Sequence, residues 1–174
     1  MPVARLEEVV GRGYADTMLR HTCADAVARI REHRAAGHRT VLVTGSIGLL
    51  AAPLAGLFDE VVGSSMHAKD GVLTGYLAKP PLVDEARAAW LLRYAEEGGY
   101  DLAASYGYGD SHSDLPWLSL LGRPSAINPD AELARESHKR NWDIHRWKSG
   151  GSGVRSEVMA ARVTMPPRTE EESA

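Results

Sequence analysis

The chain contains little of several residue types that characterise whole classes of protein. Cys23 is the only cysteine among 174 residues, so neither an intramolecular disulfide nor a thiolate metal cluster can be built from this chain. This favours a reduced, cytoplasmic setting. Neither sign of charge dominates, because 20 basic residues stand against 23 acidic ones and leave a formal net charge of -3. A broad cationic surface for nucleic acid is therefore not expected.

The sequence also shows neither a pattern for a membrane span nor one for an export signal. The longest apolar stretch, 47–58, is about a dozen residues long and contains two glycines and a proline, whereas a spanning helix needs roughly 20 apolar residues. Glu7 and Glu8 stand where a signal peptide would carry basic residues before a long apolar run. We expect a protein that neither crosses a membrane nor is exported.

The order of helix and strand patterns predicts an α/β fold. A helical pattern at 22–36 is followed by a β-branched run at 40–44, an apolar helical stretch at 47–58 and a short strand around 61–62. Strand, helix and strand within about 25 residues form the unit of a parallel sheet. Apolar residues on both faces of the first strand indicate that helices cover it on both sides.

The second half of the chain continues this alternation. Asp70-Gly71 favours a two-residue hairpin turn, which predicts a β-hairpin flap. The remaining predicted elements are a helix at 84–97, a short strand before Gly109, a helix ending at Gly122, a strand at 124–128, a helix at 131–140 and a strand at 141–147. Residues 149–174 begin with a glycine-rich stretch and have few large apolar side chains, so we expect a disordered tail there.

Two carboxylates, Asp110 and Asp114, follow the strand that precedes Gly109. Ligands of open α/β sheets bind outside the carboxyl ends of the strands, and two acids four residues apart can hold Mg²⁺ together with its waters. Alternatively, Asp110 is a turn residue and Asp114 a helix cap, since aspartate suits both positions. The position at a strand end favours a metal site, while the spacing alone leaves both interpretations open.

A second strand end carries Thr44, Gly45 and Ser46, where a hydroxyl and backbone N–H groups can hold phosphate oxygens at the start of a helix. A dinucleotide-binding oxidoreductase is a rival interpretation of the same stretch, because Gly45 and Gly48 follow a strand. The third glycine of that pattern is absent, and the nearest acids fall short of the usual offset of roughly 20 residues.

Taken together, residues 20 to 148 resemble the haloacid dehalogenase (HAD) superfamily, specifically its phosphoserine-phosphatase-like IB subclass. The resemblance rests on AAGHRTVLVTGS, on DGVLTGYL as the flap, and on YGYGDSHSDLPWL followed by INPD. It implies a three-layer, Rossmann-like core with a parallel sheet over residues 22–148. The implied activity is hydrolysis of a phosphorylated small molecule through an aspartyl-phosphate, with Mg²⁺ as cofactor.

The resemblance also implies a role for each matching residue. Thr44 binds the transferring phosphoryl group, with Gly45 and Ser46 beside it, while Asp110 ligates Mg²⁺ and Asp114 supports the metal shell. We expect Thr44 and Asp110 to be catalytic.

A third catalytic residue implied by the resemblance is Arg87, which stands where the family has a lysine that neutralises phosphoryl charge. Arginine keeps the charge and binds phosphate through two N–H groups, but its shape differs from that of an ammonium group. Two alternatives are that Lys79 supplies the cation and that Arg87 is a solvated helix residue.

The first motif of the family, a strand that ends in Asp-x-Asp and carries the nucleophile, matches nothing in this chain. The family places that strand at the centre of the sheet, so the core is expected to be incomplete between the strands that end at Thr44 and Asp110. Residues 1–21 would then be a remnant of the cap or a linker. We favour a truncated or misassigned start, and expect this chain alone to be inactive. The alternatives are a non-catalytic interaction module and a partner or upstream segment that supplies the strand.

Overall fold

The parallel strands fall into two separate sheets. Their bounds are β1 (Val41–Ile47) and β2 (Glu60–Ser64) in the first sheet, and β5 (Tyr106–Gly109), β6 (Arg123–Ile127) and β7 (Asp143–His145) in the second. The computed structural model describes residues 1–148, and among these no ladder joins β1 to β5. The tail predicted to be disordered, 149–174, lies outside the described residues.

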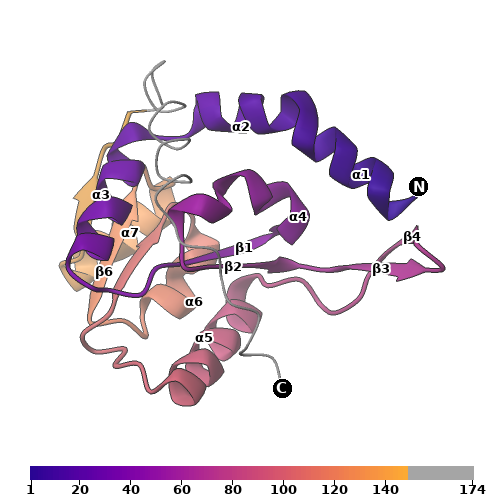
Figure 1. The fold of residues 1–174 in the computed structure, drawn as a ribbon. Coiled ribbons are helices and arrows are strands. Elements are labelled where there is room, and N and C mark those ends of the chain that lie inside the picture. The colour runs from indigo at the N-terminus through magenta and orange to yellow at the C-terminus, as the bar shows by residue number, and fades with distance from the viewer. Residues whose placement is uncertain (149–174) are drawn as a thin grey trace.

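Helices cover both sides of these strands (Figure 1). Helices α3 (Ala24–Ala35) and α4 (Gly48–Ala51) lie on one side, and α5 (Asp84–Gly98) and α6 (Leu115–Leu118) lie on the other. The α/β class and its layered, Rossmann-like arrangement are thus confirmed, because helices cover the strands on both sides as expected.

The unit of β1, α4 and β2 differs from the prediction in two respects. The predicted helix at 47–58 is a single α-helical turn, α4, followed by a 3₁₀ segment over Ala52–Leu57. Pro53 lacks a backbone N–H and interrupts the α-helical bonding, which explains the early end of α4. The strand also continues past Thr44 to Ile47, so the expected loop at residues 44–46 is extended strand instead.

A second core lies under β6. Helix α7 (Ala131–Arg140) begins at Asp130, whose side chain accepts a hydrogen bond from the Leu133 N–H, a standard N-cap arrangement. Leu133 packs with Leu118 of α6 and Ala126 of β6, and all three side chains are fully buried. This contact fixes β6 against the helix that follows the predicted metal loop.

The predicted flap is a β-hairpin of β3 (Met66–Lys69) and β4 (Val72–Leu77). Asp70 and Gly71 have φ angles of 51° and 74°, the left-handed pair that a two-residue turn of type I′ requires. The hairpin prediction is confirmed.

The first 21 residues are helical throughout most of their length. They form α1 (Val3–Val9), a π-helical segment (Val10–Tyr14) and α2 (Ala15–His21), which run along the edge of the molecule (Figure 1). Pro2 forms a bridge with Val72 of the hairpin, and Leu19 packs into a core with Val27 and Leu57. Within residues 1–148, none of the helices has the length and apolarity to cross a bilayer.

Candidate active site

Arg87 of α5 connects the ends of the two separate sheets. Its Nη1 atom donates to Oδ1 of Asp114, which follows β5, and the two side chains form an ion pair that is 14% and 7% exposed. On the other side, a β-carbon built on Gly45 of β1 would lie 3.8 Å from Nη2 of Arg87. Nε of Arg87 donates to the Leu82 carbonyl at 3.3 Å, which fixes the direction of the guanidinium. A single cation therefore reaches both predicted site loops.

Both carboxylate oxygens of Asp114 already accept hydrogen bonds. Oδ1 accepts from Arg87 and from Nε1 of Trp117 at 3.1 Å. Oδ2 accepts from the backbone N–H groups of Asp110 at 2.9 Å and Ser111 at 3.3 Å. Gly109 makes this close approach possible, because a β-carbon there would lie 2.7 Å from Oδ2. Asp114 thus holds the loop that presents Asp110, and its lone pairs are largely occupied.

The Asp110 carboxylate has a different environment. Its pKa is raised above the ordinary value, first because the carboxylate is partly desolvated and second because the Asp114 charge lies nearby. Two negative carboxylates against one guanidinium leave unbalanced negative charge at this point, which a bound cation would neutralise. The loop is also tied to the start of α7, because the Asp110 carbonyl accepts from the Asp130 N–H at 2.9 Å.

The donor set agrees with the chemistry of Mg²⁺. This hard cation binds oxygen ligands and keeps several waters, so that one or two protein carboxylates suffice. Asp110 would be the direct ligand and Asp114 would hold its backbone in place. Among residues 1–148 there is no group of three or more histidine, cysteine, aspartate or glutamate side chains that could hold a metal ion.

The predicted phosphate-binding residues lie on the β1 side of the site. The Thr44 hydroxyl accepts from the Ser46 N–H at 3.1 Å, and Gly45 packs against Val83 and Arg87. Helix α4 begins only at Gly48 and is four residues long, so the expected phosphate site at a helix N-terminus is replaced by a strand end. This geometry also lacks the long helix on which a dinucleotide-binding site depends. Lys79, the alternative cation, lies exposed between the flap and α5.

Neither Trp117 nor Asp130 was among the residues expected in the site. Trp117 lies one helical turn after Asp114 and donates to it, a spacing at which side chains meet. Asp130 accepts from the His112 N–H at 2.7 Å and so ties the metal loop to the start of α7. The cap pattern of INPDAEL indicates where the helix begins but not this second bond.

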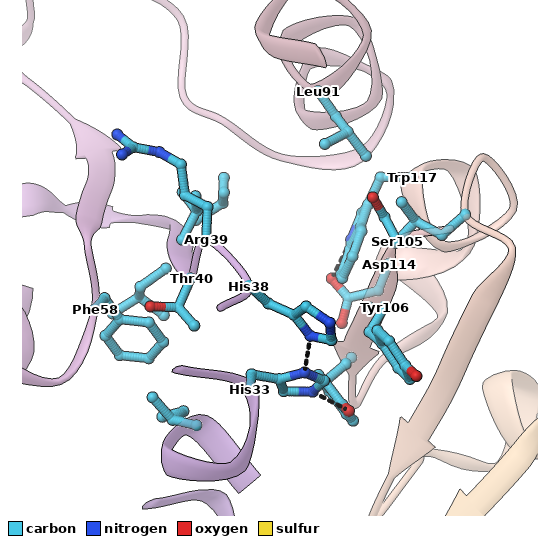
Figure 2. A pocket seen from close by; sticks show the side chains of 18 of the residues that line it. His33, His38, Arg39, Thr40, Phe58, Leu91, Ser105, Tyr106, Asp114 and Trp117 are labelled. Atoms are coloured by element: carbon cyan, nitrogen blue, oxygen red, sulfur yellow. Dashed lines mark hydrogen bonds between the residues drawn. The ribbon is translucent and has the colours of Figure 1, made fainter. Parts of the chain in front are cut away.

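A large cavity opens directly beneath these residues (Figure 2). It has a volume of about 820 Å³ and extends from Arg87, Asp110 and Asp114 along the facing edges of β1 and β5. Thr44, Gly45 and Ser46 lie outside its lining, while Val43 is part of it. Figure 2 shows side chains from α3, the start of β1, α5 and β5 turned toward a common space.

Comparisons with known proteins agree with this geometry. The family model for haloacid dehalogenase-like hydrolases matches residues 1–119. A Streptomyces azureus protein named "Inhibition of morphological differentiation protein" is 34% identical over 95% of this chain and 60% of its own length, and a Neisseria meningitidis histidinol-phosphatase is 30% identical over 68% and 56%. The chain therefore spans little more than half the length of these two relatives.

Among solved structures, a Bordetella pertussis protein of unknown function superposes with a TM-score of 0.77 at 26% identity, covering 84% of this chain and 68% of that one. The match of the family model covers more than half of the chain, and it includes β1, Arg87 and the loop from Asp110 to Asp114. The chain belongs to the haloacid dehalogenase-like hydrolase family.

Proposed function

We propose that this site is the phosphoryl- and metal-binding part of a Mg²⁺-dependent phosphomonoester hydrolase. The observation that carries the proposal is the position of Arg87, whose Nη1 pairs with Asp114 while Nη2 lies beside Gly45. A phosphoryl group between the two strand ends would meet this guanidinium on one side and a cation held by Asp110 on the other. Such fixed positive charges stabilise the charge that develops on a transferring phosphoryl group.

The residues of the site would have separate roles in binding the phosphoryl group and the metal. The Thr44 hydroxyl and the Gly45 N–H would orient phosphoryl oxygens, while the Ser46 N–H holds the Thr44 hydroxyl in place, and Arg87 would neutralise the oxygens. Asp110 would hold Mg²⁺, which as a Lewis acid polarises a phosphoryl oxygen when bound. Asp114 and Trp117 keep Arg87 and the Asp110 backbone in position through the bonds described above.

The substrate class we propose is a small phosphorylated metabolite. The relative named histidinol-phosphatase supports a phosphomonoester, and no cationic face for nucleic acid is expected from the net charge of -3. Because no Asp-x-Asp sequence occurs in the chain, the aspartate nucleophile must come from elsewhere. We therefore expect this chain alone to show no hydrolysis.

The absence of Asp-x-Asp also supports a second candidate, a non-catalytic module that retains the metal and phosphate sites for binding. Hydrolysis separates the two candidates. We would measure release of p-nitrophenol from p-nitrophenyl phosphate with and without Mg²⁺, for this chain and for the chain extended upstream in its reading frame. Mg²⁺-dependent activity in the extended chain, lost in Asp110→Ala, is the result expected for the enzyme. Two folded but inactive proteins would favour the binding module.

Metal binding is tested separately by calorimetry on the chain as it stands. Mg²⁺ should bind the wild type and not Asp110→Ala, whereas Asp143→Ala, an exposed acid at the start of β7, should bind as the wild type does. Equal affinities in wild type and Asp110→Ala would overturn the assignment of the metal ligand.

A further inference from the structure

A second pocket lies over the sheet of β5, β6 and β7, on the face opposite α6. A β-carbon built on Gly107 would lie 2.9 Å from the Trp117 side chain, so Gly107 faces α6. Because side chains alternate along a strand, Tyr106 and Tyr108 face the other way. On that side Nε2 of His33, from α3, lies 2.7 Å from the Tyr108 hydroxyl.

The neighbouring strands extend this face of the sheet. Arg123 and Ser125 of β6 stand in register with Tyr106 and Tyr108 of β5. Asp143 of β7 stands in register with Ser125. Residues in register on neighbouring strands point to the same side of a sheet. All five line a pocket of about 480 Å³, a volume within the range of small-molecule sites.

Cations outnumber acids in the lining of this pocket. Among the described residues, three guanidinium groups line it, from Arg29 of α3, Arg123 of β6 and Arg140 at the end of α7. They stand against the single carboxylate of Asp143. The whole chain has the opposite sign, with a formal net charge of -3. A guanidinium group can bind a phosphate through two parallel N–H groups, so this concentration of charge favours a phosphate ligand.

Arg123 has no carboxylate partner among residues 1–148. Its Nη1 atom donates to the Tyr106 hydroxyl, and its Cζ atom lies 4.9 Å from the centre of the same ring. The tyrosine therefore holds the guanidinium in place and leaves its charge unneutralised. By contrast, Arg29 and Arg140 each pair with a glutamate of their own helix, at 3.0 and 3.7 Å.

Ser125 gives a second, independent indication of a ligand. It is 7% exposed, and its side chain is on the face of β6 that lines the pocket. Within the part of the chain that the structure describes, its hydroxyl forms no hydrogen bond. Buried hydroxyl groups are normally hydrogen-bonded, because an unpaired one is destabilising. An acceptor atom of a bound ligand would satisfy this donor.

We propose that this pocket binds the phosphate group of a small phosphorylated molecule or free inorganic phosphate. Arg123 would pair with two phosphate oxygens, and the Ser125 hydroxyl would donate to one of them. We call it the amino-end pocket and define it by Arg29, Tyr106, Arg123, Ser125 and Arg140.

The amino-end pocket is separate from the candidate active site. Tyr106 and Arg123 are the first residues of β5 and β6, whereas Asp110 and Asp114 follow the carboxyl end of β5. A ligand in the amino-end pocket therefore cannot be the group that is transferred at Asp110. The inference does not depend on the proposed hydrolysis.

Calorimetry on the purified chain in metal-free buffer tests the ligand. The probes are inorganic phosphate, ribose 5-phosphate and ribose. We expect both phosphates to bind and ribose not to bind. Tighter binding of ribose 5-phosphate than of inorganic phosphate would identify an ester as the ligand, and equal affinities would identify the free ion. Ribose that binds as tightly as its phosphate would overturn the proposal.

Four variants test the location. Ser125→Ala should weaken phosphate binding by about tenfold or more and leave the melting temperature unchanged, because the hydroxyl has no protein partner to lose. Arg123→Gln should weaken binding at least as much. Arg135→Gln is its matched control, because Arg135 is exposed on α7, outside the lining, and removes the same charge. Asp143→Asn should tighten binding, since it removes the one negative charge from the lining.

Unchanged phosphate affinity in both Ser125→Ala and Arg123→Gln would overturn the amino-end pocket. So would phosphate binding that only Arg87→Gln abolishes, because the ion would then bind at the carboxyl ends of the strands alone. If Arg123→Gln does not fold, the comparison of Ser125→Ala with the wild type still decides. Phosphate that binds to the wild type but not to Ser125→Ala supports the pocket whether or not the extended chain hydrolyses p-nitrophenyl phosphate.

Discussion

The guanidinium of Arg87 and the carboxylate of Asp114 form a nearly buried ion pair at the junction of the two sheets. Trp117 donates to the same carboxylate and its ring lies beside the guanidinium, with the Arg87 Cζ atom 6.0 Å from the ring centroid. The pair therefore joins α5 to the loop after β5. The pair also holds Arg87 beside Gly45. Within the described residues, Arg87 is the only cationic side chain of the site in this position.

Breaking this pair should be costly. In Asp114→Asn the Arg87 charge stays buried without its counter-charge, and such single removals typically cost about 3–5 kcal/mol in the free energy of unfolding. Urea denaturation would measure the loss. Glu8→Gln is the control, because the Arg5 and Glu8 side chains are 61% and 39% exposed and surface pairs contribute about 0–1 kcal/mol. A similar small change in both variants would contradict this account of the site.

Gly109 should be intolerant of a side chain. A β-carbon there would lie 2.8 Å from Cβ and 2.7 Å from Oδ2 of Asp114, so Gly109→Ala must displace the residue that holds Asp110. We expect a loss of about 1–3 kcal/mol, the usual effect of overpacking, together with weaker Mg²⁺ binding. Gly11→Ala is the matched control, since nothing lies within 4 Å of a β-carbon there and the change should stabilise by about 0.4–1 kcal/mol. Thermal unfolding of both variants checks the prediction.

Asp59 provides a prediction about pH. Partial burial would raise the pKa of Asp59, but the hydrogen bonds from the Thr40 N–H and hydroxyl, at 2.7 and 2.8 Å, and the Arg34 charge outweigh it and lower the pKa. A lowered pKa means that the folded state favours the charged form, so this stabilisation is complete above the unfolded pKa of about 3.9 and disappears as the pH falls through the folded value. Asp59→Asn should lose about 1–2 kcal/mol at pH 5 to 7. The difference from wild type should shrink below about pH 4, and a constant difference down to pH 2 would refute the linkage.

Much of this fold follows from local patterns that act over a few residues. The turn at Asp70-Gly71, the helix α5 with Gly99 in the left-handed conformation at its end, and the cap at Asp130 were all encoded by residues whose backbone preferences are strong. The positions of Asp110 and Asp114 after a strand followed from the same alternation of elements.

Contacts between distant segments could not be predicted in this way. The bond from Arg87 to Asp114 joins residues 27 positions apart, and nothing in either local pattern encodes it. The extension of β1 through Thr44 to Ile47 depends on pairing with Ser64 of β2, so a small polar stretch that resembles a loop becomes strand. Tertiary pairing overrides local propensity in such positions.

Asp130 should affect metal binding although it does not face the metal. Its Oδ1 accepts from the Leu133 N–H and its Oδ2 from the His112 N–H, both at 2.7 Å, so that one carboxylate fixes the start of α7 and the loop that carries Asp110. Asp130→Ala removes both bonds and should lower the melting temperature and weaken Mg²⁺ binding by about 10- to 100-fold, as loss of supporting residues around metal ligands typically does. Asp130→Ser can still cap the helix but is too short to reach both N–H groups. It should therefore restore most of the melting temperature and little of the metal affinity, and calorimetry with thermal unfolding of the two variants would separate the two roles. If Asp130→Ser bound Mg²⁺ as tightly as the wild type, the bond to His112 would have no part in holding the metal loop.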